Sequence, residues 1–160
     1  HYAAIAGQLE TVDIAYKSQV SEADFASNFE SLLEQDLSLR RTSRGIHKDD
    51  FVFQLNGHPI KKFGSQGQKK SFLISLKLAQ FFIFNAIKGT KPILLLDDIF
   101  DKLDDQRIFH LMARVAKKEF GQLFITDARP ERSKEILQTI QAAATFFTIE
   151  SGTISNRQIG

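Results

Sequence analysis

Two adjacent aspartates, Asp97 and Asp98, directly follow an aliphatic run in the segment ILLLDDIFDKLDD, residues 93–105. Four consecutive aliphatic residues predict a short strand buried in a parallel sheet, and carboxylates at the end of such a strand lie where α/β sheets bind ligands. One aspartate could bind Mg²⁺, which takes few carboxylates besides phosphate oxygens and water, while the other orients or deprotonates a water. The alternative is that one aspartate only caps the following helix.

A second candidate site is the segment GSQGQKK, residues 64–70, which precedes a long apolar stretch. Its two glycines, its hydroxyl and a following helix N-terminus would together favour a phosphate, because free backbone N–H groups and the helix dipole attract anions. A glycine-bearing turn with a serine N-cap is the alternative. The sequence has neither a GxxxxG spacing nor a Gly-Lys-Ser/Thr, so it lacks a P-loop and is expected to bind nucleotide poorly by itself.

Basic residues gather around Arg44 and Lys48, next to His47, Asp49 and Asp50. The formal net charge of +2 is too small to indicate nucleic-acid binding by itself. The cluster could be a solvated face, a set of structural salt bridges or a DNA contact through Arg44 and Lys48. A metal site built from one His and two Asp is disfavoured by the adjacent lysine and by the strand expected from Asp50.

Composition limits the class of protein. The 160 residues are 42% hydrophobic and 25% charged, which suits a soluble globular chain. The absence of Cys excludes disulfides, thiolate metal sites and a Cys nucleophile, and fits a cytoplasmic location. Apolar runs are shorter than the roughly 20 residues that span a bilayer, so we expect no membrane partner. The chain begins at His1 without Met, so we expect a fragment.

These candidate residues must be positioned by regular elements. Alternation predicts a strand over 11–20, and helical spacing predicts a helix over 21–39. Residues 50–63 predict a hairpin that turns at Asn56-Gly57, because both central residues of a type I′ turn need positive φ. The stretch 71–87 is apolar nearly all round, which predicts a helix buried on most sides.

The later part of the chain alternates strands and helices. We expect strands over 93–96 and 123–126, helices over 104–118 and 130–140, and a final hairpin over 145–155 that turns at Ser151-Gly152. This order predicts an α/β fold whose parallel sheet carries an added edge hairpin.

The order of these motifs carries a resemblance. A Ser-x-Gly-Gln turn that opens a helix, followed by LLLDD and FDKLD, is similar to the signature motif, Walker B and D-loop of ATP-binding-cassette proteins. Within that superfamily, GSQGQKKSFLISLKLAQ and PILLLDDIFDKLD, with GIHKDDFVFQLNG upstream and GQLFITD downstream, resemble the C-terminal part of the RecF family of bacterial recombination and repair proteins, which are SMC-like ATPases. The resemblance is good over roughly residues 36–127.

The resemblance implies a partial P-loop NTPase fold of the ABC/SMC-like head type, whose Walker A lobe would lie upstream of His1. Residues 1–62 would end a second, arm lobe, and residues 63–160 would form the C-terminal part of the head. In the family, two ATPs are sandwiched between head-to-tail subunits. Asp97 would then organise Mg²⁺, Asp98 would activate water as the catalytic residue, and Asp104 would be the D-loop aspartate that crosses the dimer interface. The loop that contacts the nucleotide of the opposite subunit would comprise Ser65, Gln66, Gly67, Gln68 and Lys69.

Three positions depart from the pattern of the superfamily. Many cassette ATPases have Gly-Gly where this chain has Gln66-Gly67, and Glu where it has Asp98, and the shorter acid would slow hydrolysis and favour a switch over a pump. The switch-region His is replaced by Thr126, which could donate to a γ-phosphate or cap a helix.

The resemblance implies DNA repair and replication as the setting, with ATP and Mg²⁺ as cofactors of the full-length protein. ATP would close a homodimer on duplex or junction DNA, and partners would include recombination mediators such as RecR. The full-length protein would be a weak ATPase and these residues alone inactive. The alternatives are a receiver-like, Mg²⁺-dependent signalling domain built on Asp97, Asp98 and Thr126, and a non-catalytic interaction lobe. The receiver-like arrangement lacks a further Asp at a strand end between the acidic pair and Thr126.

Overall fold

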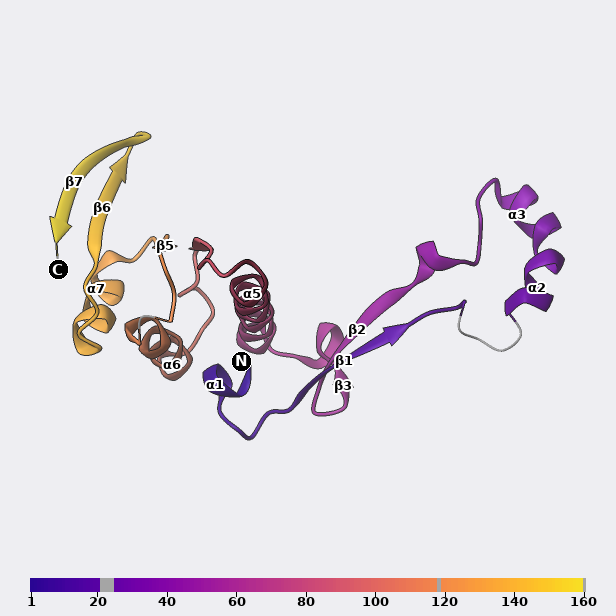
Figure 1. Cartoon of the computed structure of the whole chain (residues 1–160), viewed down its shortest axis with the longest axis horizontal. Helices are drawn as coiled ribbons and strands as arrows, with labels where there is room; N and C mark the ends of the chain where they lie inside the picture. Colours follow the sequence, from indigo (N-terminus) through magenta and orange to yellow (C-terminus); the bar gives the residue numbers. More distant parts are fainter. Residues whose placement is uncertain (21–24, 118, 160) are drawn as a thin grey trace. The chain divides into compact units, whose positions relative to one another are not determined.

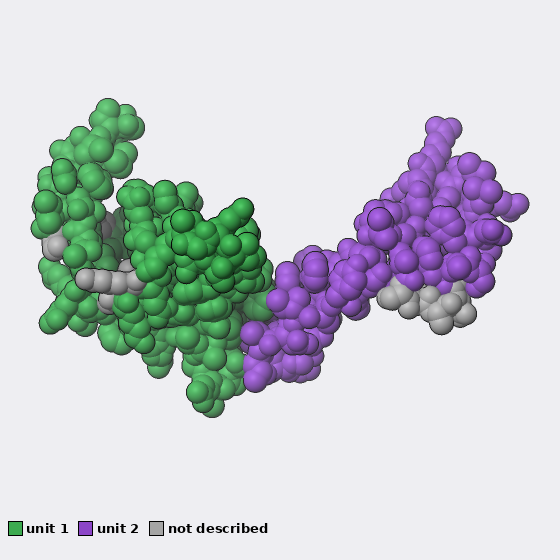
Figure 2. Space-filling view, in the orientation of Figure 1, with its two compact units in different colours: residues 1–10, 65–160 green, residues 11–64 purple. Residues whose placement is uncertain are grey.

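The computed structural model describes residues 1–20, 25–117 and 119–159, and it divides the chain into two compact units (Figures 1 and 2). Unit 1 comprises residues 1–10 and 65–160, and unit 2 comprises residues 11–64. We expected the boundary at 62/63, close to where unit 1 resumes at Ser65. The first ten residues, which we expected in the arm lobe, pack instead with unit 1.

Unit 2 is built on an antiparallel sheet. Strand β1 (Val12–Lys17) pairs with β2 (Asp50–Leu55), with Val12 opposite Leu55, and the short β3 (His58–Pro59) pairs with β2. Asn56 and Gly57 turn the hairpin with φ of 50° and 77°, as the sequence predicted. The second strand is shorter than predicted, because residues after Pro59 form the helical turn α4 (Ile60–Phe63), which buries Ile60.

The single helix predicted over 21–39 is two helices, α2 (Phe25–Ser31) and α3 (Leu33–Leu39). They are separated at Leu32, whose φ of -89° and ψ of -3° depart from helical values. The predicted start at Ser21 lies outside the described residues. A 3₁₀ turn, η1 (Ile46–Lys48), leads into β2.

Unit 1 is organised around the long helix α5 (Gln66–Lys88), which ends at Gly89 with φ of 67°. Burial on most sides was a wrong prediction: Ile74, Leu78 and Phe81 face the core, whereas Leu73 and Ile87 are 56% and 72% exposed. The helix is long and apolar enough to cross a membrane by composition. Core helices of soluble proteins can have the same composition, and the face of α5 with Ile74, Leu78 and Phe81 packs into the core of unit 1.

The parallel pair β4 (Leu94–Leu96) and β5 (Leu123–Ile125) places Leu94 opposite Leu123 and Leu96 opposite Ile125. The buried core joins β4 to α5, to α6 (Asp105–Ala116) and to the N-terminal helix α1 (Ala3–Ala6). Its fully buried members include Ile5, Leu78, Phe100, Ile108, Leu111 and Met112. This packing confirms the predicted α/β class with a parallel pair at its centre.

Helix α7 (Pro130–Thr139) leads to a hairpin of β6 (Thr145–Glu150) and β7 (Thr153–Ile159), which turns at Ser151 and Gly152. We predicted this hairpin as an edge of the parallel sheet. It forms a separate two-stranded sheet instead, since the tight turn makes each strand the other's nearest partner.

Candidate functional site

The acidic pair stands at the carboxyl end of β4 but not on the strand itself. The strand ends at Leu96, and Asp98 has a left-handed backbone with φ of 46°. Strand alternation therefore does not determine the directions of the two aspartate side chains. Asp97 and Asp98 lie on the exposed turn that follows, where Asp is one of the few non-glycine residues that tolerate this conformation.

Thr126 joins the two aspartates. Because Leu96 and Ile125 are opposite in the parallel pair, the next residues on both strands also meet. The Thr126 hydroxyl donates to Asp97 Oδ1 and accepts from the Asp98 backbone N–H at 2.9 Å, and the Thr126 N–H donates to the Leu96 carbonyl at 3.0 Å. The structure thus brings together three of the predicted residues, Asp97, Asp98 and Thr126, at one edge of the sheet.

The start of α5 forms a reciprocal capping box. The Ser65 hydroxyl accepts from the Gln68 N–H at 3.2 Å, and Gln68 Oε1 accepts from the Ser65 N–H at 2.8 Å. Gln66 and Gly67 are the first helical residues, and the Lys69 N–H donates to the Ser65 carbonyl at 3.0 Å. The predicted glycine-containing loop is therefore a capped helix N-terminus.

Two contacts place this N-terminus beside the acidic turn. Lys70, on the first turns of α5, donates from Nζ to the main-chain oxygen of Asp98. A Cβ on Gly67 would lie 3.0 Å from the Lys102 carbonyl oxygen, so a side chain there would require the 97–104 loop to shift by a few tenths of an ångström. Lys102 itself has φ of 63°. The two segments singled out in the sequence are neighbours in unit 1.

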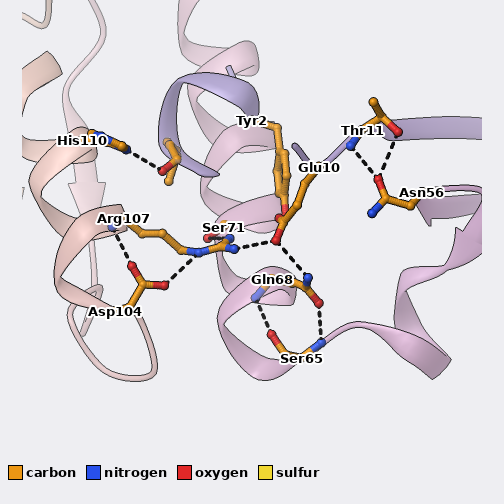
Figure 3. A network of polar contacts seen from close by, with 11 residues as sticks. Tyr2, Glu10, Thr11, Asn56, Ser65, Gln68, Ser71, Asp104, Arg107 and His110 are labelled. Carbon is orange, nitrogen blue, oxygen red and sulfur yellow. Dashed lines mark hydrogen bonds and ion pairs between the residues drawn. The ribbon is translucent and has the colours of Figure 1, made fainter. Parts of the chain in front are cut away.

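Asp104 caps α6 and is fixed by Arg107. The Arg107 N–H donates to Asp104 Oδ1 at 2.8 Å, and Arg107 Nε donates to Asp104 Oδ2 at 3.0 Å. Figure 3 shows that the same guanidinium reaches two further residues, Ser71 Oγ at 3.0 Å and Glu10 Oε1 at 2.8 Å. Arg107 thereby connects the D-loop candidate with the interior of the unit.

Glu10 receives hydrogen bonds from three directions. Tyr2 Oη and Arg107 Nη2 donate to its carboxylate, and Gln68 Nε2 donates to Oε1 at 3.0 Å (Figure 3). The Arg107 and Glu10 side chains are 13% and 17% exposed, so this ion pair is largely removed from water. Sequence reasoning missed Glu10, since nothing near residue 10 resembles a motif. The spacing of Asp104 and Arg107, three residues apart at a helix start, was a usable signal for their pairing.

The network perturbs the ionisation of its members. Burial would raise the pKa of Glu10, but hydrogen bonds from Gln68, Tyr2 and Arg107 outweigh it and lower this pKa. Burial and the hydrogen bond to Glu10 raise the pKa of Tyr2 from 10.0 to about 12. Burial disfavours the charged form of Arg107, yet the contacts with Tyr2 and Glu10 raise its pKa. The carboxylate and the guanidinium are therefore both charged at neutral pH.

A second arginine, Arg132 of α7, holds the loop between β4 and α6. Its guanidinium donates to the carbonyl oxygens of Phe100 at 3.2 Å and Leu103 at 3.4 Å, and it pairs with Asp105. No pattern in the sequence indicated this contact. It shows that the loop carrying the candidate residues is tied to the unit by its main chain as well as by its side chains.

The basic candidates belong to unit 2. Lys48 lies in η1, and Arg44 precedes it. Asp49 accepts from the Tyr16 hydroxyl and from the Gln19 N–H at 3.3 Å, and the hydrogen bond from Tyr16 lowers the pKa of Asp49. Among the described residues no group of three His, Asp or Glu side chains could hold a metal ion. Asp49 is thus held by hydrogen bonds within unit 2, and the roles of Arg44 and Lys48 stay predictions.

The acidic turn fits a different kind of cation site. Mg²⁺ is commonly held by one or two carboxylates with water and phosphate oxygens, so it needs no cluster of three acids. Asp97 is exposed and has a second carboxylate oxygen besides Oδ1, which accepts from Thr126. The residues at this turn therefore suit a hard cation whose other ligands are water and phosphate oxygens.

Comparison with known proteins identifies relatives over nearly the whole chain, although no family model matches it. The "DNA replication and repair protein RecF" of Flavobacterium johnsoniae is 48% identical over 149 residues, which are 93% of this chain and 42% of the relative. The protein of the same name from Cytophaga hutchinsonii is 48% identical over 154 residues, 96% of this chain and 41% of the relative. The chain thus spans about two fifths of the length of these relatives.

Two solved structures share the fold. One, described as the recombination mediator protein RecF-ATPrS in the RecFOR pathway, has a TM-score of 0.63 at 24% identity and covers 91% of this chain and 39% of that chain. The other, described as RecF-ATP in the same pathway, has a TM-score of 0.58 at 28% identity and covers 75% and 34%. The α/β fold expected of a partial ABC/SMC-like head is confirmed. Together with the identities of the relatives, these matches show that the chain belongs to the RecF family.

Proposed function

We propose that this chain supplies the trans-acting half of an ATP site in a DNA repair protein whose binding to DNA is controlled by ATP. In this proposal two full-length subunits associate head to tail. Each gives the helix N-terminus at Ser65 and the D-loop residue Asp104 to the nucleotide of the other. The acidic turn, Asp97 and Asp98, serves the nucleotide of its own subunit.

One observation carries the proposal: the helix N-terminus and the acidic turn are joined at one edge of the sheet. Lys70 of α5 bonds to the main chain of Asp98, and Thr126 of β5 bonds to both aspartates. This edge is formed by the carboxyl ends of two parallel strands, where α/β folds bind ligands. A purely structural lobe would not need two exposed carboxylates there, one of them in a left-handed backbone conformation.

Each residue has a separate task. Asp97 would hold Mg²⁺, which when bound neutralises phosphate charge. Asp98 would accept a proton from the attacking water, as the catalytic base. Ser65, with the N–H groups of Gln66 and Gly67, would bind γ-phosphate oxygens of the opposite subunit, where the helix dipole favours an anion.

The remaining members of the turn and the strand edge complete the arrangement. Gln68 holds Ser65 in place through the capping box, and Lys69 adds positive charge beside it. Thr126 keeps Asp97 and Asp98 oriented, so its role here is positioning and not γ-phosphate binding.

The setting of the proposal follows from the family. The full-length protein would act in the cytoplasm with ATP and Mg²⁺, bind DNA as an ATP-dependent homodimer, and cooperate with mediator proteins such as RecR. Arg44 and Lys48 of unit 2 are the proposed DNA contacts, and binding through them would weaken steeply with salt. The receiver-like alternative is abandoned, because the relatives of this chain are RecF proteins.

The test is ATP hydrolysis by the full-length protein in the presence of DNA. Asp98→Asn should lower kcat by at least about 100-fold, the usual contribution of a general base, while ATP-dependent dimers persist. Glu150→Gln is the matched control, because it also neutralises an exposed carboxylate of unit 1 but lies at the tip of the β6–β7 hairpin. Wild-type hydrolysis by the Asp98→Asn protein would refute the assignment.

The 160-residue chain gives an independent test. It contains no P-loop sequence, so it should show no ATP hydrolysis above background at any concentration. Robust hydrolysis that depends on Asp98 would show that the nucleotide site is built differently.

A further inference from the structure

Glu10 contacts both of the segments that the proposed function presents to the opposite subunit. Its carboxylate accepts from Gln68, which closes the capping box at Ser65, and from Arg107, which holds Asp104 through two hydrogen bonds. Glu10 is 58 residues from Gln68 and 97 residues from Arg107 in the chain. A single carboxylate therefore ties together two segments that are otherwise far apart in sequence (Figure 3).

We propose that Glu10 and Arg107 are a pair of positioning residues that couple the helix N-terminus at Ser65 to Asp104. When one of these two segments adopts the geometry that it needs for binding, the other adopts its own binding geometry as well. The inference rests on the proposed function for what the two segments bind. The coupling itself is a property of unit 1.

The chemistry of Arg107 makes the coupling strong. Its planar guanidinium bridges two carboxylates, with Nε on Asp104 and Nη2 on Glu10, while Nη1 reaches Ser71 on α5. Lys cannot make three such contacts in fixed directions. The side chain is 13% exposed, so water is a poor substitute for any partner that is lost.

The carboxylate of Glu10 is held in place by three donors. With donors from Tyr2, Gln68 and Arg107, its two oxygens are engaged, and moving the carboxylate to follow one partner would break its bonds with the others. A displacement of Asp104 would therefore move Gln68 through the side chains of Arg107 and Glu10. The main chain also links the segments, because Gly67 lies against the carbonyl of Lys102, two residues before Asp104.

The coupling is tested in the 160-residue chain by amide hydrogen exchange measured with NMR. The three reporters are the N–H groups of Ser65, Gln68 and Arg107, which donate to Gln68 Oε1, Ser65 Oγ and Asp104 Oδ1. Glu10→Gln should raise the exchange rate of all three by roughly fivefold or more, the lower bound for coupled sites. Acceleration at Arg107 alone, or at none of the three, would overturn the coupling.

The control is Glu119→Gln, which breaks the ion pair between Glu119 and Arg114; Arg114 lies on helix α6, as Arg107 does. That pair has an N···O distance of 2.9 Å against 2.8 Å for Arg107 and Glu10, and its arginine is 15% exposed. Glu119→Gln should leave the three reporter amides unchanged. If it accelerates them as much as Glu10→Gln does, the effect is general destabilisation and the proposal fails.

The functional consequence is tested in the full-length protein. Glu10→Gln and Arg107→Lys should weaken ATP-dependent dimerisation by about 5- to 150-fold, while the affinity of the monomer for ATP stays unchanged. A loss of folding would lower both. Equal dimerisation by wild-type, Glu10→Gln and Glu119→Gln proteins would overturn the inference. Absence of ATP-dependent dimers in the wild-type protein would instead refute the proposed function, and the exchange rates would still decide the coupling.

Discussion

Deprotonation of Tyr2 should unfold or loosen unit 1 at high pH. The Tyr2 side chain is 4% exposed and its hydroxyl donates to the charged Glu10. Burial and this hydrogen bond raise the pKa of Tyr2 from 10.0 to about 12, so the folded state favours the protonated phenol. The stabilisation is fully present below pH 10 and is lost as pH rises through 12. Two pKa units correspond to at most about 3 kcal/mol in the free energy of unfolding.

The sequence makes the assay unusually direct. The chain has two tyrosines and no tryptophan, so tyrosinate absorbance at alkaline pH reports Tyr2 and Tyr16 alone. Tyr16 is 60% exposed, and Tyr2→Phe leaves it as the single tyrosine. The difference between wild-type and Tyr2→Phe titrations therefore gives the titration of Tyr2. Urea unfolding of both proteins between pH 8 and pH 12 gives the linked change in stability, and effects of lysine deprotonation cancel between them.

Two results would refute this reasoning. The first is a Tyr2 titration with a midpoint near the ordinary value of 10.0 in the folded chain. The second is a pair of stability curves for wild-type and Tyr2→Phe that run parallel from pH 8 to pH 12. Either result would mean that the Tyr2 hydroxyl is not held against a buried carboxylate, and that Glu10 lacks one of its three donors.

Three further substitutions probe the geometry of the site. Phe100→Ala removes a ring that is 0% exposed in the 97–104 loop, and it should lower the free energy of unfolding in urea by about 3–5 kcal/mol; a loss below about 1 kcal/mol would contradict the burial. Thr126→Val removes the hydroxyl that serves Asp98 N–H, and because the site is exposed it should cost about 1 kcal/mol, with Thr126→Ser as the near-neutral control. Gly67→Ala should give no net stabilisation, since the helix preference for Ala, up to about 1 kcal/mol, is opposed by a contact of 3.0 Å with the Lys102 carbonyl; a full gain in thermal unfolding would disprove that close approach.

Local patterns in the sequence predicted the elements whose structure depends on local rules. The turn at Asn56-Gly57 needed only the preference for positive φ, and the strand 93–96 needed only an apolar run before a polar break. The N-cap at Ser65, which the sequence allowed as the alternative to a phosphate site, also depends only on neighbouring residues. These features are set by neighbours in the chain or by the register of a single strand pair.

Features set by tertiary contacts were not predictable. The exposed face of α5 has the composition of a buried one, so apolar content could not tell which side of the helix is covered. The final hairpin was predicted from its turn residues, but a turn does not show which other strands a hairpin will pair with. Glu10 owes its place to residues 58 and 97 positions away, and no local pattern records such contacts.

The capping box at Ser65 also decides what that serine can still offer a ligand. A hydroxyl has one proton to donate and two lone pairs to accept. The cap uses a lone pair, because Ser65 Oγ accepts from the Gln68 N–H. The proton is left for an acceptor, and a phosphate oxygen is one. The capping role of Ser65 is therefore compatible with the proposed role as a phosphate donor. The cap fixes the position of Oγ, and the hydroxyl can still donate its proton to a phosphate oxygen.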